Sequence, residues 1–387
     1  MRIAFYAPMK APDDLTPSGD REMAVLLMNT CIMAGHEVEV ASSFRAYEGA
    51  GNPALQEKLL QGAEREAARV IQRYRAREKD LKPEIWFSYH VYYKSPDWIG
   101  PLVAKALDIP YVLAEASYAP SRAEGPWSIG HKGAELAIKS ADLIFSMTSI
   151  DAEGIDKILD PAQKHRDLPP FLDPKPYAKA QRNDLQPGQP VRLLAVGMMR
   201  PGDKLESYRR LADYLARVKR QDWSLTIVGD GNARTEVQAA LMPLGQDRLH
   251  FKGARQKIEM PNIYANADIY VWPAAGEAYG MALLEAQAAG LPVVAGKVRG
   301  VPDVMLDGQT GFLTPEGDAD AFAGVIDFLI SDSEARRQMG ETAKRFVGNM
   351  RSMEKAAIIL NDGLLAVRPG LHPRPRRILD RLWHRKK

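Results

Sequence analysis

The feature of this sequence that most constrains its fold is an alternation of short apolar segments with helix-forming segments, which occurs twice along the 387 residues. In the first series, a predicted strand at 2–7 is followed by a helix at 21–33 and a strand at 36–41. Strands that alternate with helices pair in parallel, because each crossover returns the chain to the same end of the sheet. The sequence therefore predicts an α/β protein with two Rossmann-like domains, each built on a parallel sheet.

A chain of 387 residues exceeds what a single hydrophobic core usually supports, which favours two domains. Seven prolines fall between Pro161 and Pro190, where periodic apolar positions are few. We therefore expect a first domain at 1–165, a Pro-rich linker at 166–190 and a second domain at 191–350. A helix at 351–367 and a basic tail at 368–387 follow.

The composition, with 45% hydrophobic and 26% charged residues, is that of a globular protein. Cys31 is the only cysteine, so an internal disulfide framework is excluded. The first predicted strand begins at residue 2 and leaves no room for a signal peptide, and no apolar run approaches the length of about 20 residues that spans a membrane. We expect a cytoplasmic protein.

The net charge of +3 conceals a basic tail, since residues 368–387 hold eight Lys or Arg and one Asp. Two interpretations stay open. The tail is a solvated, disordered segment, or it lies on an anionic membrane surface at the inner face of the membrane through its apolar side chains. A nucleic-acid partner is not expected, because the tail lacks a base-reading module and the rest of the chain is slightly acidic.

Two glutamates, Glu277 and Glu285, are separated by seven residues in a stretch that predicts a loop, a short helix, a glycine stop and a buried strand. Helix formers follow Tyr279 and Gly280, and Gly290 ends the helix. Glu285 is thus expected one turn inside the helix, with Glu277 in the loop before it. In the simpler interpretation, both are ordinary solvated carboxylates.

The start of this predicted helix has the chemistry of a diphosphate site, because first-turn amides are free donors at the positive end of the helix dipole. Glu285 can accept hydrogen bonds from a vicinal diol such as a ribose, and Glu277 can reach other hydroxyls. A nucleoside diphosphate carrying a sugar would supply all three partners. The residues expected to bind this donor beside Glu285 are Tyr279, Gly280, Met281 and Ala282.

This pattern of two glutamates resembles the signature of the retaining family-4 glycosyltransferases of the GT-B fold. The resemblance extends to residues 300–318 downstream and to residues 196–197 and 227–231 upstream. It implies two Rossmann-like domains facing a cleft, of which the first binds the acceptor and the second the nucleotide-sugar donor, with the helix at 351–367 returning to the first domain. It also implies a carbohydrate or lipid-linked acceptor and transfer with retention, without a cofactor or metal. In that family the first glutamate contacts the donor sugar and the second the ribose. The resemblance also implies a role in bacterial polysaccharide or glycolipid assembly.

Fixed cations are expected near a diphosphate, since a helix terminus alone contributes only about 0.3–1 kcal/mol per anionic contact. Arg200 and Lys204 follow a predicted buried strand and lie at its carboxyl end, where open α/β sheets bind ligands. The family usually has an Arg directly after Gly197, and here the Arg comes two positions later. With Glu277 they form the predicted catalytic set, unless they are only surface charges on a loop.

Two glycine-containing loops are further candidates. Gly229 and Gly231 follow a strand, but Arg234 stands where the dinucleotide-binding fingerprint requires a third glycine. Gly229 is expected either to contact the donor or to make a purely structural turn. In the first domain, Gly19 is predicted to approach the donor phosphate closely, and Asp20 is predicted to cap the following helix.

On the acceptor side, many relatives carry a His after the strand at 111–114, where this chain has Glu115. Glu115 is expected to bind an acceptor hydroxyl, or else to pair with Arg122 or a helix terminus. His90, at the end of a strand, is a second candidate.

No metal site is expected. Asp318 and Asp320 open a predicted helix and are interpreted as caps rather than metal ligands. Two other functions remain as alternatives. A nucleotide-sugar epimerase of the same fold would convert the donor without an acceptor, and a non-catalytic binding protein would hold the donor without releasing its diphosphate.

Overall fold

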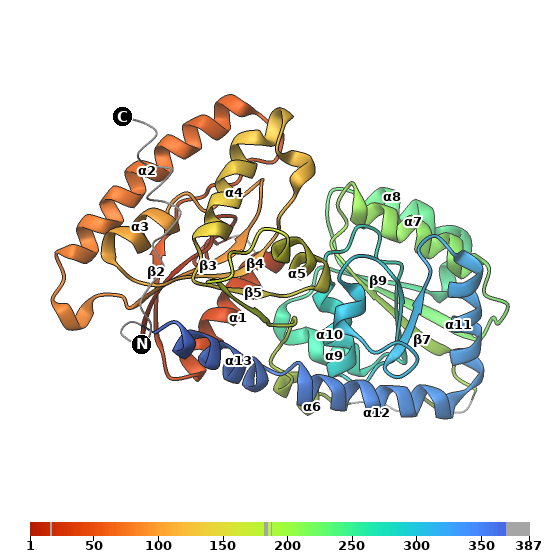
Figure 1. The fold of residues 1–387 in the computed structure, drawn as a ribbon. Coiled ribbons are helices and arrows are strands. Elements are labelled where there is room, and N and C mark those ends of the chain that lie inside the picture. The colour runs from red at the N-terminus through yellow and green to blue at the C-terminus, as the bar shows by residue number, and fades with distance from the viewer. Residues whose placement is uncertain (16–17, 182–184, 187, 369–387) are drawn as a thin grey trace. The chain divides into compact units, whose positions relative to one another are not determined.

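The computed structural model describes residues 1–15, 18–181, 185–186 and 188–368. The chain divides into two compact units: unit 1 comprises Met1–Pro169 with the chain from Glu354 onward, and unit 2 comprises Pro170–Met353. Each unit has one parallel sheet covered by helices (Figure 1). The predicted α/β class with two parallel sheets is confirmed. Of the predicted basic tail, the residues after Arg368 lie outside the described residues.

The sheet of unit 1 has the strand order β2-β1-β3-β4-β5-β6, with every pair parallel. Its central strand β4 is buried at every position, which explains why it is apolar without alternation. The edge strand β6 carries four polar or charged residues and was not predicted. The strands are β1 (Arg2–Tyr6), β2 (Glu37–Ser42), β3 (Ile85–Val91), β4 (Tyr111–Ala116), β5 (Leu143–Ser146) and β6 (Lys164–Asp167).

Helices cover both faces of this sheet, and a core of aromatic and aliphatic side chains lies beneath them. The helix predicted to return to the first domain is α13, in which a Cβ at Gly363 would lie 2.4 Å from the ring of Phe145 in β5. A glycine is thus needed where α13 packs on the sheet. The helices are α1 (Gly19–Met33), α2 (Pro53–Arg75), α3 (Gly100–Leu107), α4 (Ser128–Ser140), α5 (Ser149–Asp156) and α13 (Met353–Ala366).

The sheet of unit 2 has the strand order β12-β11-β10-β7-β8-β9, again with every pair parallel. Strands β10 and β11 are buried along their whole length. This is the doubly wound order, in which the chain moves outward in both directions from two central strands. The strands are β7 (Val191–Val196), β8 (Trp223–Val228), β9 (Leu249–Gly253), β10 (Ile269–Trp272), β11 (Val293–Gly296) and β12 (Gly311–Thr314).

The helices of unit 2 include one in the segment predicted to be a linker. Helix α6 buries Tyr177 against Tyr264, with 6.0 Å between the ring centroids. Part of this Pro-rich segment is therefore structured, because an aromatic side chain anchors it to unit 2. The helices are α6 (Lys175–Lys179), α7 (Asp203–Ala216), α8 (Arg234–Leu241), α9 (Met260–Ala265), α10 (Met281–Ala288), α11 (Ala319–Ser331) and α12 (Ser333–Met350).

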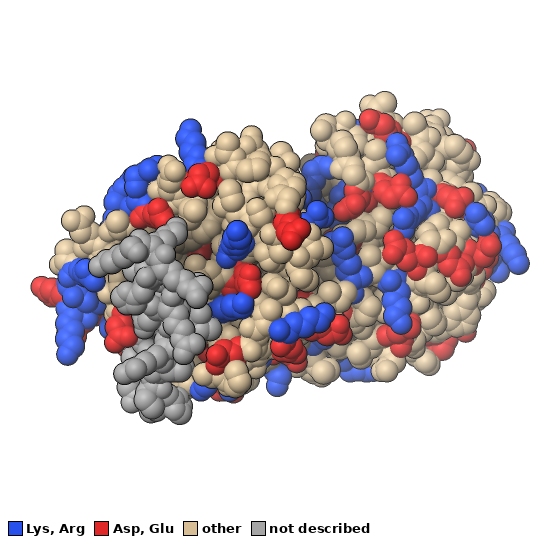
Figure 2. Space-filling view, turned by 45° about the horizontal axis from the view of Figure 1, so that its top comes forward, with Lys and Arg blue, Asp and Glu red and all other residues tan. Residues whose placement is uncertain are grey.

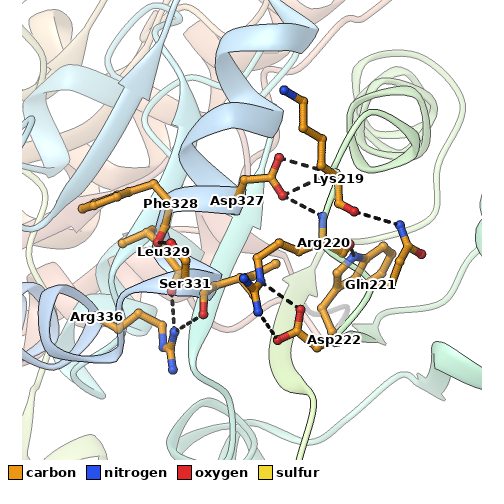
Figure 3. Close-up of polar contacts among 11 residues, drawn as sticks. Lys219, Arg220, Gln221, Asp222, Asp327, Phe328, Leu329, Ser331 and Arg336 are labelled. Atoms are coloured by element: carbon orange, nitrogen blue, oxygen red, sulfur yellow. Dashed lines mark hydrogen bonds and ion pairs between the residues drawn. The ribbon is translucent and has the colours of Figure 1, made fainter.

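Charged side chains fix the connection between α7 and β8 to helix α11 (Figure 3). The carboxylate of Asp327 accepts the amides of Lys219 and Arg220 at 3.1 and 2.9 Å, and Arg220 pairs with Asp222 at 2.9 Å. At the start of α11, Asp318 accepts the amide of Ala321 at 2.9 Å, so its predicted capping role is confirmed. These contacts secure the fold and leave the carboxyl ends of the strands to other side chains.

None of the described helices is long and apolar enough to cross a membrane. On the face of the molecule shown in Figure 2, basic and acidic side chains of the described residues are interspersed. Open α/β sheets bind ligands at the carboxyl ends of their strands, and both sheets of this protein are of that kind.

Candidate active site

In unit 2 the predicted catalytic residues meet at the point where the strand order reverses. Strands β7 and β10 are neighbours, but the chain continues from β7 toward β8 and from β10 toward β11, on opposite sides. The loops beyond the carboxyl ends of such strands diverge and leave room for a ligand. Arg200 follows β7, Lys204 lies in the first turn of α7, and Glu277 follows β10.

Lys204 and Glu277 form an ion pair, with 2.5 Å between Nζ and Oε2. The same oxygen accepts a hydrogen bond from Nε1 of Trp272 at 3.2 Å, and Nζ lies 5.4 Å from the Trp272 ring centroid. The two charged side chains are 24% and 16% exposed, so they are held in place and still reachable. Trp272 thus orients both charges, the carboxylate by a hydrogen bond and the ammonium by the face of its ring.

The three predicted catalytic residues line one cavity of about 490 Å³. Its wall depends on Gly276, where φ is +63° and a Cβ would lie 2.3 Å from the carboxyl group of Asp203. A glycine is therefore required at this bend. The residues around the cavity are Arg200, Pro201, Asp203, Lys204, Asn232, Ala275, Gly276 and Glu277.

The signature helix α10 begins at Met281, with Gly280 as its N-cap at φ +81°, within one or two residues of the predicted start. A Cβ at Gly280 would lie 2.7 Å from the Leu283 side chain and 3.2 Å from that of Glu277. Gly280 therefore lets the loop that carries Glu277 pass close to the start of the helix. The amide of Leu283 donates to the Gly280 carbonyl at 3.0 Å, whereas the amides of Met281 and Ala282 come too early in the helix to have an acceptor within it.

Glu285 lies one turn inside α10, as predicted, and two tyrosines hold it. The hydroxyl of Tyr264 donates to Oε2 at 2.8 Å, and the hydroxyl of Tyr177 donates to the same carboxylate. Burial, and then the adjacent carboxylate, raise the pKa of Tyr264 and of Tyr177 well above the usual value. Neither tyrosine was predicted as part of the site. The one signal in the sequence was Tyr177, an aromatic residue in an otherwise polar, Pro-rich segment.

The structure places Gly229 away from the walls of the cavity. Its φ is +144°, and a Cβ there would lie 1.8 Å from the carbonyl oxygen of Gly197. At Gly231 a Cβ would lie 2.2 Å from the carbonyl oxygen of Met199. Close approach of the β7 and β8 loops accounts for both glycines, which supports the structural-turn interpretation, and donor contact by Gly229 stays a prediction.

In unit 1 the remaining candidates form a charged cluster at the corresponding point, where β1 and β3 are neighbours. Nδ1 of His90 lies 3.1 Å from Asp20, and Nε2 lies 3.8 Å from Glu115. The prediction that Asp20 caps helix α1 is wrong. Ser18 is the N-cap, because its side chain accepts a hydrogen bond from the amide of Arg21. Asp20 stands in the first turn and contacts His90 instead.

The backbone at this cluster is strained, since His90 and Glu115 have φ of +62° and +57°. Residues other than glycine adopt this region rarely, and such strain concentrates at functional sites. Burial alone would lower the pKa of His90, but Glu115 and then Asp20 outweigh it and raise the pKa to about 9. Burial raises the pKa of the Glu115 carboxyl, against the opposing charge of His90. His90 is therefore a cation held between two carboxylates at neutral pH.

Two further positions in unit 1 were predicted. Arg122 lies over the ring of Tyr93, with its guanidinium carbon 5.5 Å from the ring centroid, so its suggested pairing with Glu115 is not what the structure shows. Gly19 is exposed, and a Cβ there would meet nothing within 4 Å. The fold itself does not require a glycine at this position. Close approach of the donor to Gly19 stays a prediction.

Within the described residues, no group of three or more His, Cys, Asp or Glu side chains is arranged to hold a metal ion. Asp320, the second aspartate considered as a ligand, pairs with Arg217 at 3.1 Å.

Residues 179–346 match the model of the family described as glycosyl transferases group 1. The match contains the ion pair, the cavity and helix α10. Residues 179–346 are thus similar to the glycosyl transferases group 1 family, in agreement with the resemblance that the sequence predicted.

Among the curated relatives, sulfoquinovosyl transferase SQD2 of Arabidopsis thaliana is 27% identical over 260 residues, which cover 62% of this chain and 49% of that protein. D-inositol 3-phosphate glycosyltransferase of Corynebacterium jeikeium is 28% identical over 222 residues, which cover 53% of each chain. The chain thus spans about half the length of these curated relatives.

Solved structures resemble the whole chain. Anabaena Alr3699/HepE in complex with UDP has a TM-score of 0.71 and 16% identity, covering 95% of this chain and 100% of that one. Sucrose-phosphate synthase of Thermosynechococcus elongatus has a TM-score of 0.70 and 18% identity, with coverage of 93% and 97%. At these identities the likeness establishes the fold, and the predicted GT-B fold is confirmed.

Proposed function

We propose that this protein is a glycosyltransferase that moves a sugar from a nucleotide-diphosphate sugar to an acceptor hydroxyl with retention of anomeric configuration. The observation that carries the proposal is the Lys204–Glu277 ion pair over Trp272, at the strand-order reversal of unit 2 and close to the start of α10. The match of residues 179–346 to the glycosyl transferases group 1 family supports a nucleotide-sugar donor, and so does the similarity to Alr3699/HepE, whose structures contain UDP and UDP-glucose.

Each group in unit 2 has a role in this proposal. The diphosphate binds to the first-turn amides of α10, with Arg200 and Lys204 beside it. Glu277 accepts hydrogen bonds from the donor sugar, and its orientation comes from Trp272. Glu285 accepts from the ribose, and the two tyrosines fix its carboxylate.

In the reaction, the bond between the anomeric carbon and the diphosphate oxygen breaks, and a bond from the acceptor oxygen to that carbon forms on the same face. The acceptor proton passes to the departing phosphate oxygen. Negative charge grows on the diphosphate as the bond breaks, and Lys204, Arg200 and the α10 amides stabilise it in the transition state. Because these groups supply the positive charge, we propose transfer without a divalent metal, which activity in the presence of EDTA would test.

The acceptor is a carbohydrate or a lipid-linked carbohydrate in this proposal, and the setting is bacterial polysaccharide or glycolipid assembly in the cytoplasm. The names of the curated relatives include acceptors as different as D-inositol 3-phosphate and L-malate, so similarity alone does not select one. The basic tail at 368–387 would contact an anionic membrane surface if the acceptor is lipid-linked.

The test begins with a thermal-shift screen of nucleotide sugars, because a ligand bound only by the folded state raises the apparent stability. With the donor found, Glu277→Ala and Lys204→Ala should each abolish most of the nucleoside diphosphate release, while Lys219→Ala, an exposed control in unit 2, should not. The anomeric proton coupling of the product, measured by NMR, checks retention. Unchanged turnover in both site variants would remove the assigned site, and donor conversion without an acceptor would identify an epimerase instead.

A further inference from the structure

A series of aromatic rings runs outward from His90 at the carboxyl end of the unit 1 sheet. The ring centroid of His90 lies 5.0 Å from that of Tyr92, Tyr92 lies 5.5 Å from Tyr93, and Tyr93 lies 5.2 Å from Trp127. The rings come from the loops after β3 and β4, and those of Tyr92 and Tyr93 are partly exposed. Tyr92 and Tyr93 thus form a partly exposed aromatic surface, supported by the buried Trp127, beside the strained cluster of His90 and Glu115.

Two cations lie against these rings. Nζ of Lys94 is 5.9 Å from the Tyr93 ring centroid and 5.4 Å from that of Trp127. The guanidinium carbon of Arg122 is 5.5 Å from the Tyr93 centroid. Among the described residues, neither Lys94 nor Arg122 forms an ion pair with a carboxylate. The aromatic faces therefore position two positive charges that no acidic side chain neutralises.

One buried carboxylate beside these loops, that of Glu48, already accepts hydrogen bonds from backbone amides. Glu48 accepts the backbone amides of Ala50, Gly51 and Asn52 at 2.7, 2.7 and 2.9 Å. Its own amide donates to the carbonyl oxygen of Lys94 at 2.9 Å, which ties the two loops together. Glu48 thus shapes the loop that supports Lys94 and leaves the ammonium group for another partner.

We propose that this ring and cation surface (Tyr92, Tyr93, Lys94, Arg122 and Trp127) binds a phosphate group on the acceptor, so that the acceptor is a sugar or polyol phosphate, free or as a lipid headgroup. The inference rests on the proposed function, because it specifies the acceptor of that reaction. Arg122 can bind a phosphate bidentately and Lys94 adds a point charge. The rings pack against the apolar face of a sugar, and Glu115 accepts from its hydroxyls.

The experiment compares glucose 6-phosphate with glucose, and phosphatidylglycerol vesicles with phosphatidylcholine vesicles, by calorimetry and co-sedimentation on the full chain. We expect one phosphorylated probe to bind at least about tenfold more tightly than its neutral counterpart. Lys94→Met and Arg122→Gln should each remove that preference. Arg69→Gln, which changes an exposed arginine on α2, should keep it, and so should Lys204→Met, which separates this site from the donor cavity.

The outcomes assign the source or overturn the proposal. A preference for glucose 6-phosphate that both variants remove identifies a free acceptor, and the same dependence with phosphatidylglycerol alone identifies a lipid headgroup. Equal binding of phosphorylated and neutral probes, or a preference that survives both variants, overturns the proposal. If nucleotide sugars bind in a way that depends on Lys204, but phosphorylated and neutral probes bind equally, this proposal is overturned and the proposed function is retained. A phosphate preference without any nucleotide-sugar binding would remove the proposed function and keep the anion site.

Discussion

The two units place charged side chains at equivalent points of their sheets, but they assemble them in different ways. In unit 2, Glu277 and Glu285 come from one short stretch, and Lys204 joins them from a neighbouring loop. In unit 1, Asp20 and Glu115 come from separate elements, and both lie near His90 only because β1, β3 and β4 are side by side. A site built from one stretch is visible in a sequence, whereas a site built by strand order is not.

The two clusters also differ in where strain lies. In unit 1 the candidate residues His90 and Glu115 themselves have left-handed backbone. In unit 2 the left-handed positions lie beside the ion pair and not at its two residues: Ala274, Gly276 and Gly280 flank Glu277, and Gly202 precedes Lys204. Unit 2 therefore strains the loop that carries its site, and unit 1 strains the candidate residues, which suggests that their side chains must point in directions that an ordinary strand end does not allow.

The largest expected effect on catalysis comes from removing the ion pair between Lys204 and Glu277 in unit 2. Glu277→Gln and Lys204→Met should each lower kcat/KM by about 100-fold, because each removes a charge directed at the donor. Since the two charges form one pair, the double variant should lose far less than the product of the single losses. Steady-state kinetics of nucleoside diphosphate release measure this, and strictly multiplicative losses would show that the two residues act independently.

The next effect separates a glycine required by the fold from one that the fold does not require. Gly229→Ala should reduce the free energy of unfolding by about 1–3 kcal/mol, because its Cβ meets the backbone of Gly197. Gly19→Ala should leave unfolding unchanged and, if the donor approaches there, weaken donor binding. Urea unfolding and donor titration of both variants provide the measurements. Destabilisation at Gly19 would mean that the fold itself needs this glycine.

A smaller effect is expected at the tyrosines that hold Glu285. Tyr264→Phe and Tyr177→Phe should each raise KM for the donor about tenfold with little change in kcat, because each removes one hydrogen bond to a charged carboxylate. Tyr270→Phe is the matched control, since its hydroxyl donates to the Val196 carbonyl instead. An equal change in the control would attribute the effect to packing of the aromatic cluster.

The smallest expected effect is on the pH dependence of stability, which tests the cluster of His90, Asp20 and Glu115 in unit 1. The pKa of His90 is raised to about 9, so its stabilising charge is fully present below the ordinary value of about 6.5 and is lost as pH rises through about 9. His90→Gln should flatten this part of the stability profile, measured as the urea midpoint at each pH between about 6 and about 9.5. His250→Gln, at an exposed position on β9, is the control. A profile that His90→Gln leaves unchanged would contradict the arrangement of His90 between Asp20 and Glu115.

Much of the fold followed from periodicity, because the central strands are continuous apolar runs between glycines and helix formers. The short edge strand β6 did not, since its sequence Lys-His-Arg-Asp is typical of a loop and it forms a strand only by pairing with β5. Helix α6 was missed for a related reason. Its five residues include a proline, and Tyr177 gives it stability only when it packs on Tyr264.

By itself, the sequence determined the alternation that produces two parallel sheets, the helix that starts beside Gly280 and the pair of glutamates around that start. These depend on neighbouring residues, whose propensities and spacing are the same in any context. Only the tertiary structure decided that Lys204 pairs with Glu277 over Trp272, that two distant tyrosines hold Glu285, and that Asp20 meets His90 rather than capping its helix. Such contacts depend on which strands become neighbours, and strand order is set by the packing of the whole sheet.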